Sequence, residues 1–280
     1  MTKKTLITGA NGFIGMHLSQ ALRKKEEEVY TLSRGGKGSK HFPLDILDFD
    51  SYGEYDLIYH LAATTNPREC EDNPNVAWST NVDGTRHIVS QLSKGQHIVY
   101  ASTPHVYSSQ RNGDLLEDTP LGPPSVYGLT KMVGEELIRV FSRRQEFSYT
   151  TFRIFNAYGP GQKQGQIVPD VIGKIARQDR TSIIGAGNSI SPVYLEDVID
   201  AFTNPLLPPD TYNICGEEVS IERIYHIIGT LLGKSDFISE PSEKKRMCGS
   251  RDKISKYKKN WTSLEEGLYQ TVAASDFKKV

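Results

Sequence analysis

Apolar and polar positions recur with two different periods along the first 150 residues. Short apolar runs of strand length stand at residues 4–8, 28–32, 57–61, 97–101 and 148–152. Stretches with helical spacing of apolar positions lie between them, at residues 13–25, 76–92 and 126–142. Strands that alternate with helices long enough for a crossover predict a parallel sheet covered by helices. The predicted fold class is therefore α/β, with a doubly wound sheet.

The pattern becomes less regular after residue 156. Residues 158–166, YGPGQKQGQ, are rich in turn formers, and residues 204–210 form a proline-rich break. A helix is predicted between them, at residues 168–178. These features predict a first domain at residues 1–155 that also takes residues 192–215. Residues 156–191 and 216–280 then form a smaller carboxy-terminal domain.

Three glycines lie between the first predicted strand and the first predicted helix. They are Gly9, Gly12 and Gly15 in TLITGANGFIG. Because glycine has no Cβ, such a turn lets the backbone approach a pyrophosphate, and the free N–H groups at the helix start meet its negative charge. The GxxGxxG spacing after a strand predicts a dinucleotide site.

Tyr127 and Lys131 stand four residues apart in a predicted helix, so both side chains point to one face. A phenol has a pKa near 10, and a nearby ammonium stabilises the phenolate. The spacing therefore predicts that Lys131 lowers the pKa of Tyr127, which could then exchange protons with a hydroxyl or ketone. Thr103 follows the strand at residues 97–101.

Composition narrows the classes of function. The 33 basic and 34 acidic residues give a net charge of −1, which predicts neither a nucleic-acid nor a membrane partner. Cys70, Cys215 and Cys248 are far apart without CxxC spacing, so neither a disulfide framework nor a metal site is predicted. No leader and no apolar run of membrane-spanning length is apparent, and a cytoplasmic location is expected.

Several motifs then follow one another in a familiar order. They are TGANGFIG at 8–15, HLAA at 60–63, NVDGT at 81–85, STPHVYS at 102–108, YGLTK at 127–131, FRIFNAYGPGQ at 152–162, PVYLEDV at 192–198 and WTSLEEGL at 261–268. With them, almost the whole chain resembles the extended short-chain dehydrogenase/reductase family of nucleotide-sugar epimerases, dehydratases and reductases. The resemblance implies a Rossmann domain that holds NAD(P) and a carboxy-terminal domain that binds a nucleoside diphosphate sugar.

The resemblance also implies roles for single residues. Thr103, Tyr127 and Lys131 would be catalytic, and Thr103, His105 and Asn156 would contact the substrate, Asn156 at its diphosphate. The cofactor would be bound by Gly9, Asn11, Gly12, Phe13, Ile14, Gly15, Ser33, Arg34, Asp45, Ile46, Leu61, Ala62, Ala63, Tyr127 and Lys131. Family members often form homodimers through helices at the positions of residues 76–92 and 126–142.

The end of the second strand bears on the choice of dinucleotide. An acidic residue there would bind the adenine ribose of NAD, but this chain has Ser33 and then Arg34. A guanidinium can pair with a 2′-phosphate, so NADP is favoured and NAD is the alternative. An Arg34 that merely solvates a loop would leave the choice open. Asp45 resembles the family's adenine-side aspartate, although a helix cap explains it as well.

The residues after Thr103 bear on the reaction. Sugar dehydratases carry an acidic pair there, whereas this chain has Pro104 and His105, which disfavours 4,6-dehydration. His105 is either an auxiliary acid or a packed loop residue. The leading hypothesis is an NADPH-dependent reductase of a nucleotide-linked 4-keto sugar. The alternative is a C4 epimerase with tightly bound NAD, and a non-catalytic NADP-binding protein is a third possibility.

One expected substrate contact is missing. Relatives that bind UDP-sugars often carry a diphosphate-binding arginine shortly before the tyrosine of PVYLEDV, but here that stretch reads Ile190, Ser191 and Pro192. Arg246 or Arg251 would have to supply the charge, unless both are ordinary surface residues.

Overall fold

The computed structural model describes residues 3–25, 28–108, 113–178, 180–240 and 244–275. The chain divides into two compact units. The first comprises Met1–Ser108, Glu117–Arg153 and Phe202–Tyr212, and the second comprises Ser109–Leu116, Ile154–Ala201 and Asn213–Val280.

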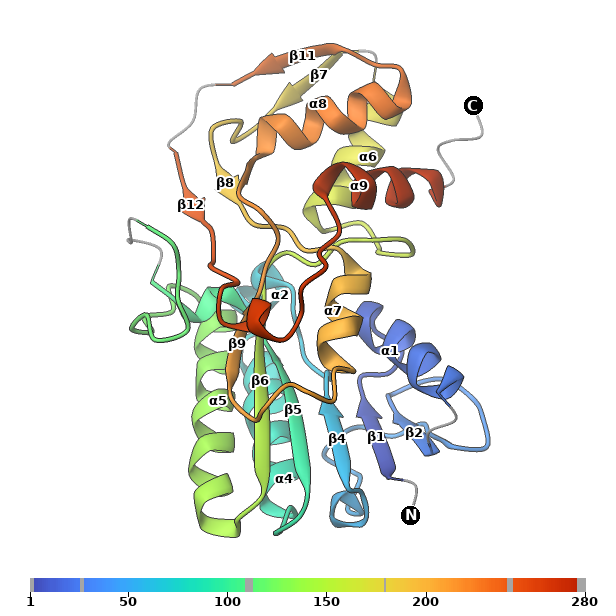
Figure 1. Cartoon of the computed structure of the whole chain (residues 1–280), viewed down its shortest axis with the longest axis vertical. Coiled ribbons are helices and arrows are strands. Elements are labelled where there is room, and N and C mark those ends of the chain that lie inside the picture. The colour runs from blue at the N-terminus through green and yellow to red at the C-terminus, as the bar shows by residue number, and fades with distance from the viewer. Residues whose placement is uncertain (1–2, 26–27, 109–112, 179, 241–243, 276–280) are drawn as a thin grey trace. The chain divides into compact units, whose positions relative to one another are not determined.

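A seven-stranded sheet has the order β3-β2-β1-β4-β5-β6-β9 (Figure 1). Its strands are β1 (Lys4–Thr8), β2 (Glu28–Leu32), β3 (His41–Phe42), β4 (Leu57–His60), β5 (His97–Ser102), β6 (Ser148–Ile154) and β9 (Thr211–Ile214). The pairings from β3 through β6 are parallel. The α/β prediction is confirmed, and the five predicted strands are found with ends that differ by at most two residues. The short β3 and β9 were not predicted.

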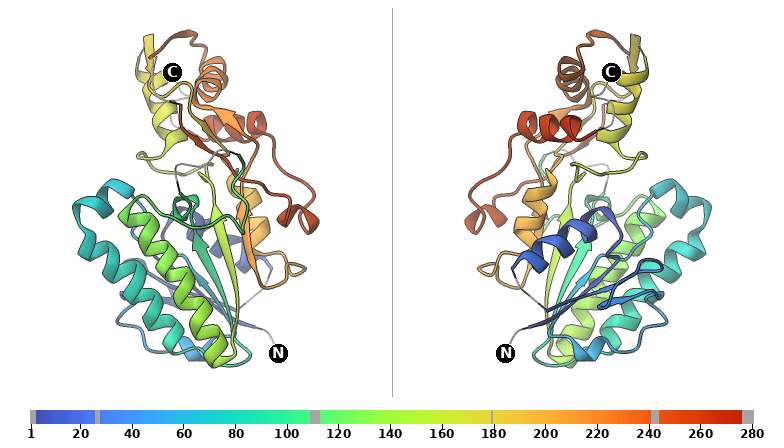
Figure 2. Two further views of the ribbon diagram at one scale, coloured as in Figure 1. Left: turned by 90° about the vertical axis from the view of Figure 1, so that its left-hand side faces the viewer. Right: turned by 90° about the vertical axis from the view of Figure 1, so that its right-hand side faces the viewer.

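Helices cover both faces of the sheet in the first unit. They are α1 (Phe13–Lys24), α2 (Pro67–Asp72), α3 (Pro74–Trp78), α4 (Gly84–Ser90) and α5 (Val126–Gln145), with short helical turns η1 (Tyr52–Glu54) and η3 (Pro104–Val106). Figure 2 shows α4 and α5 on one face and α1 on the other. Apolar side chains of the sheet and helices meet in a core that includes Leu6, Ile58, Ile98 and Ile138, each fully buried. Burial of these side chains is the main stabilising contribution to the unit.

The helix predicted at residues 76–92 is found at residues 74–90, but it contains a π-helical turn that was not predicted. The chain forms α3, then a π-helical turn, η2 (Ser79–Asp83), and then α4. The wider π turn changes the direction in which side chains leave the helix, and such turns concentrate at functional sites. A π turn holds one residue more than an α-helical turn. The apolar spacing of the turns on either side is unchanged, so the periodicity of the sequence does not reveal the extra residue.

The second unit has its own core. Its helices are α6 (Ile167–Arg177), α7 (Leu195–Phe202), α8 (Ile221–Leu232) and α9 (Leu264–Ala273), with a short turn, η4 (Ile254–Lys256). Two small sheets pair β7 (Arg180–Ile183) with β11 (Asp236–Ser239), and β8 (Ser189–Ile190) with β10 (Val219–Ser220) and β12 (Arg246–Met247). The helix predicted at residues 168–178 is confirmed. Among the described helices none is long and apolar enough to cross a membrane.

Candidate active site

The glycine turn joins β1 to α1 in the shape that the spacing predicts. Gly9 has a φ of +67°, and a Cβ there would lie 2.6 Å from the backbone nitrogen of Ala62. A Cβ on Gly15 would overlap the backbone of Gly9. At Gly9 only glycine satisfies both the left-handed backbone and the close packing, and at Gly15 the close packing alone requires it.

The amino end of α1 is open to an anion. Gly12 is its N-cap and provides no side-chain hydrogen bond, and the first turn has no acidic residue. The first backbone N–H groups of a helix have no partner within the helix, and the helix dipole places positive charge there. The residues predicted for this turn, Asn11 and Phe13 to Gly15 included, therefore fit the pyrophosphate of a dinucleotide.

The loop after β2 is held to the glycine turn by one carbonyl. The oxygen of Gly35 accepts hydrogen bonds from Asn11 Nδ2 and from Ser33 Oγ, and it lies 2.9 Å from Nε2 of His41. Arg34 is exposed in this loop and has no ion-pair partner among the described residues. Its charge is therefore available to a ligand.

The other residues predicted for the cofactor have structural contacts of their own. Asp45 accepts a hydrogen bond from the backbone N–H of Leu47 and thus caps a turn rather than a helix, and the Ile46 side chain is buried in the core. The N–H groups of Leu61 and Ala62 both donate to the hydroxyl of Thr8 across the start of the irregular segment after β4, which continues through Ala63. These contacts order the backbone at the carboxyl ends of β1 and β4.

The structure brings Thr103, Tyr127 and Lys131 together in the first unit. Thr103 follows β5, and Tyr127 and Lys131 lie on one buried face of α5. Their exposed fractions are 4%, 8% and 3%. Each residue of this group can therefore act on a ligand without competition from bulk water.

Burial sets the ionisation of the two titratable members. It raises the pKa of Tyr127 to about 12, although hydrogen bonding with Thr103 lowers it in part. Burial also lowers the pKa of Lys131 to about 7, against a smaller opposing effect of Glu135. The prediction that Lys131 lowers the pKa of Tyr127 below its ordinary value is wrong for the cofactor-free chain, because the loss of water around the phenol outweighs any neighbouring charge.

Lys131 has no hydrogen-bond partner among the described residues. A buried ammonium without one is costly, and hydroxyl oxygens would relieve that cost. This fits a lysine that holds a cofactor ribose, as the resemblance implies. Together with the open end of α1, it shows that the residues present fit a nicotinamide dinucleotide.

The position of α5, which carries Tyr127 and Lys131, depends on residues to which the motifs assigned no role. Glu71 on α2 accepts a hydrogen bond of 2.8 Å from the N–H of Val126, the first residue of α5, and Ser125 caps the next free N–H at Gly128. Asn81 on the π turn donates to the hydroxyl of Thr130. Only the NVDGT motif hinted at Asn81, because a contact between elements leaves no periodic signal in the sequence.

His105 lies beside Tyr127, with ring centroids 5.7 Å apart in an edge-to-face arrangement. Burial lowers its pKa, so the imidazole is neutral at physiological pH. Its backbone N–H donates to the hydroxyl of Thr103, which caps η3. These contacts place His105 beside Tyr127 and Thr103, but they do not indicate that its imidazole transfers a proton.

Arg153 has the structural role expected for it. It forms an ion pair of 2.7 Å with Glu135 and donates to the hydroxyl of Tyr107. Since all its groups are occupied in this buried network, Arg153 is not available to a substrate phosphate.

Asn156, in the second unit, has a side-chain oxygen that is not hydrogen-bonded within the described residues. Its backbone φ is +39°, and the oxygen, Oδ1, is buried. A buried amide without a partner is unfavourable, and such groups concentrate at ligand sites. This arrangement is compatible with the predicted role at the substrate diphosphate.

The two arginines considered as replacements for the missing diphosphate arginine are both engaged in ion pairs. Arg246 contacts Asp114 and Glu218, and Arg251 lies 3.5 Å from Glu217 and stacks on the ring of Trp261. Two carboxylates thus neutralise the positive charge of Arg246 within the second unit. This argues against Arg246 as the arginine that binds the substrate diphosphate.

Comparison with known proteins gives a consistent result. Residues 5–215 match the family described as "NAD dependent epimerase/dehydratase family". The chain is 30% identical to a putative UDP-glucose 4-epimerase of Methanocaldococcus jannaschii, over 81% of this chain and 82% of the relative. It is 26% identical to UDP-glucuronic acid decarboxylase 1 of Xenopus tropicalis, over 96% of this chain and 71% of the relative. A solved UDP-glucuronic acid 4-epimerase of Bacillus cereus, in complex with UDP-glucuronic acid and NAD, superposes with a TM-score of 0.84 at 26% identity over 99% of both chains.

The cost of burying Lys131 leads to a prediction about stability. Replacing Lys131 by Met should raise the free energy of unfolding of the cofactor-free protein near pH 7, because the unfolded lysine is fully protonated while the folded one is held at a pKa of about 7. The gap should close as the pH rises towards 10.5, the ordinary lysine value, where both states lose the proton. Denaturant unfolding of both proteins across this pH range measures the gap. A mutant that is less stable at every pH would contradict the prediction.

Proposed function

Because the chain belongs to the NAD-dependent epimerase/dehydratase family, we propose that it inverts C4 of a UDP-sugar with NAD retained on the protein. The observation that carries the proposal is the single buried group of Thr103, Tyr127 and Lys131, with Pro104 and His105 in place of an acidic pair. Similarity to the UDP-glucuronate 4-epimerase of Thermodesulfobacterium geofontis, over 95% of this chain and 94% of the relative, supports epimerisation as the reaction.

The chemistry follows from the residues of this group. The glycine turn and Lys131 would hold the dinucleotide, which supplies a carbon that accepts a hydride and returns it. Tyr127, as phenolate, would take the proton of the sugar hydroxyl at C4 and would return it to the same oxygen in the product. Lys131 stabilises the phenolate and Thr103 orients the sugar oxygen. No net oxidation results, and the product differs from the substrate only at C4.

Protonation states explain why the ligand matters to this group. The reactive pair is a phenolate beside an ammonium, yet burial favours the neutral form of both residues. Hydroxyl groups that hydrogen-bond to the ammonium stabilise its charge and thereby the phenolate. The reactive pair is thus favoured only when ligand hydroxyl groups reach Lys131.

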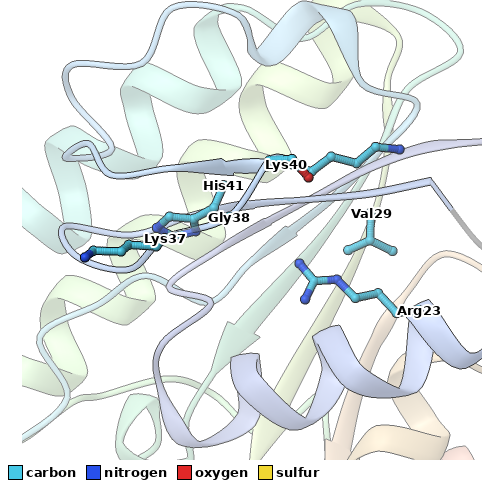
Figure 3. Close-up of a pocket in the computed structure, with 7 residues that line it drawn as sticks. Arg23, Val29, Lys37, Gly38, Lys40 and His41 are labelled. Atoms are coloured by element: carbon cyan, nitrogen blue, oxygen red, sulfur yellow. The ribbon is translucent and has the colours of Figure 1, made fainter.

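A second candidate is the NADPH-dependent reduction of a nucleotide-linked 4-keto sugar. The charges near β2 favour it. Arg34 has no acidic partner among the described residues, and a hollow of about 340 Å³ beside the same loop is lined by Arg23, Lys37, Lys40 and His41. Figure 3 shows the guanidinium of Arg23 rising from α1 toward the loop that carries Lys37 and His41. Such a basic loop suits a 2′-phosphate, but the solved UDP-glucuronic acid 4-epimerase of Bacillus cereus holds NAD, which makes the epimerase the better supported function.

Replacing Tyr127 by Phe tests the catalytic assignment. The variant should lose turnover by at least about a hundredfold, because only the proton carrier is removed. Its affinity for NAD should stay within about threefold, since the ring and its packing remain. Chromatography of the products from UDP-glucose and from UDP-glucuronate measures the activity. Release of CO₂ from UDP-glucuronate distinguishes a decarboxylase from an epimerase, which releases none. Activity close to that of the wild type would disprove the assignment.

The cofactor can be tested at Arg34. The epimerase proposal predicts that NAD remains with the purified protein and that Arg34→Ala hardly changes its affinity. The reductase candidate predicts instead that the same substitution weakens NADPH binding by about tenfold to a hundredfold, through the loss of a charge-assisted pair. Fluorescence titrations with NADH and NADPH on both proteins distinguish the two. Tighter binding of NADPH to the wild type would move the choice to the reductase.

We also propose that two copies of the chain associate through α3 and α5. Both helices expose large apolar side chains, with Val76 at 52%, Trp78 at 41% and Val140 at 51% exposure. Apolar surface of this kind on neighbouring helices suits a homodimer interface. The occupant is a second copy, because the family resemblance places its dimer contacts on helices at these positions.

Light scattering of purified protein tests the dimer. The wild type should have twice the mass of the chain, and Trp78→Glu should reduce it to the mass of one chain because a charge would be buried at the contact. Leu206→Glu, at an apolar residue that is 74% exposed outside these helices, is the matched control and should stay dimeric. A monomeric wild type would exclude the proposed association.

A further inference from the structure

The ammonium of Lys131 lies over the face of an aromatic ring. Its Nζ is 4.1 Å from the centroid of the Tyr100 ring, and Tyr100 is fully buried on β5. A cation at this distance from a ring face is attracted by the negative potential of the π system, and more strongly so when water is excluded. We propose that Tyr100 is a positioning residue that holds Lys131 for catalysis and cofactor binding, in a space that Gly134 leaves open for the ring.

Gly134 explains how the ring fits against the catalytic helix. It lies on α5 one turn after Lys131, and a Cβ at this position would lie 2.9 Å from Cζ of Tyr100 and still closer to its hydroxyl. Any larger residue would therefore displace the ring. Residues three apart on a helix share a face, so the gap at Gly134 and the lysine stand side by side. The absence of a side chain at Gly134 therefore lets the ring lie against the ammonium.

His60 contacts the same ring on β4, with centroids 5.4 Å apart. Its Nδ1 lies 3.0 Å from the hydroxyl of Thr8, and its Nε2 lies 2.9 Å from the hydroxyl of Thr85. Burial and the nearby Lys131 lower the pKa of His60 to about 3, so the imidazole is neutral. Tyr100 therefore faces a single cation, and its orientation is restricted by neighbours on β4 and α5.

Lys131 is the group whose charge changes near neutral pH. The other titratable groups that face it are His60, Tyr100, Tyr127 and Glu135. The pKa of Tyr100 is raised well above 10 and that of Tyr127 to about 12, while His60 stays neutral. Glu135 is ion-paired with Arg153. A pH change between about 6 and 9 therefore alters the charge of Lys131 and leaves His60, Tyr100 and Tyr127 neutral.

The role in catalysis rests on the proposed function, but the contact itself can be tested without any substrate. A double-mutant cycle compares Tyr100→Leu with Tyr100→Phe, each with Lys131 and with Lys131→Met, by denaturant unfolding of the cofactor-free protein. Phe keeps the ring and Leu removes it. Lost packing is common to both lysine backgrounds and cancels, so the cycle isolates the interaction of the ring with the cation.

The expected coupling is about fivefold to thirtyfold in the unfolding equilibrium constant at about pH 6, where Lys131 is charged. It should vanish at about pH 9, where the lysine is neutral. A coupling that is equal at both pH values, or absent at pH 6, would overturn the proposal. Should the Leu variant fail to fold, Gly134→Ala displaces the ring without deleting it and should show the same pH-dependent coupling with Lys131→Met.

Cofactor binding provides the functional readout. As the pH rises, NAD affinity should decline in step with the charge of Lys131, and in Tyr100→Leu this decline should begin about one pH unit lower, because the ring no longer stabilises the ammonium. Tyr100→Phe should restore the wild-type profile. An unshifted profile in Tyr100→Leu would contradict the positioning role. Absence of epimerase activity with this shift intact would instead reject the proposed function and leave the role of Tyr100 standing.

Discussion

The site is organised around one buried ammonium that has lost its water. Lys131 has no hydrogen-bond partner among the described residues, and burial brings its pKa to about 7. Its surroundings limit this cost without removing it. The ring of Tyr100 offers a face to the cation, His60 remains neutral, and Glu135 contributes negative charge one turn along α5. The hydroxyl groups of a ligand would accept the hydrogen bonds that the ammonium does not form within the protein. A polar group buried in a core, by contrast, has its partners inside the protein.

Other parts of the molecule also carry polar or charged groups without a partner among the described residues. The amino end of α1 has neither a side-chain cap nor an acid in its first turn, Arg34 carries an unpaired charge, and the buried amide oxygen of Asn156 lacks a partner among the described residues. By contrast, Arg153 and Arg246 are paired in ion-pair networks. In these examples the paired groups hold the fold, whereas the groups without a described partner lie at positions that the family resemblance assigns to ligand contacts.

The choice between an epimerase and a reductase depends on the loop after β2 rather than on the catalytic group. Thr103, Tyr127 and Lys131 serve both reactions, since each requires a proton carrier beside a carbon that gains or loses a hydride. The loop combines a neutral Ser33 with an Arg34 that has no ion-pair partner among the described residues, while the solved Bacillus cereus relative holds NAD. A protein can keep such a charge for solubility alone, so the relatives weigh more than the loop.

The α/β class, five strands and most helices could be predicted from the amino-acid sequence, and Thr103, Tyr127 and Lys131 could be proposed from it as a catalytic group. These follow from apolar periodicity and from motifs that are contiguous in the chain, where spacing of four on a helix already places Tyr127 beside Lys131. Four features could be recognised only in the folded chain: the π turn at η2, the contact of Glu71 with the start of α5, the ring of Tyr100 against Lys131, and the direction in which the pKa of Tyr127 moves. Each of these depends on groups from different elements and on how far water is excluded, and burial is a property of the assembled core that local spacing does not carry.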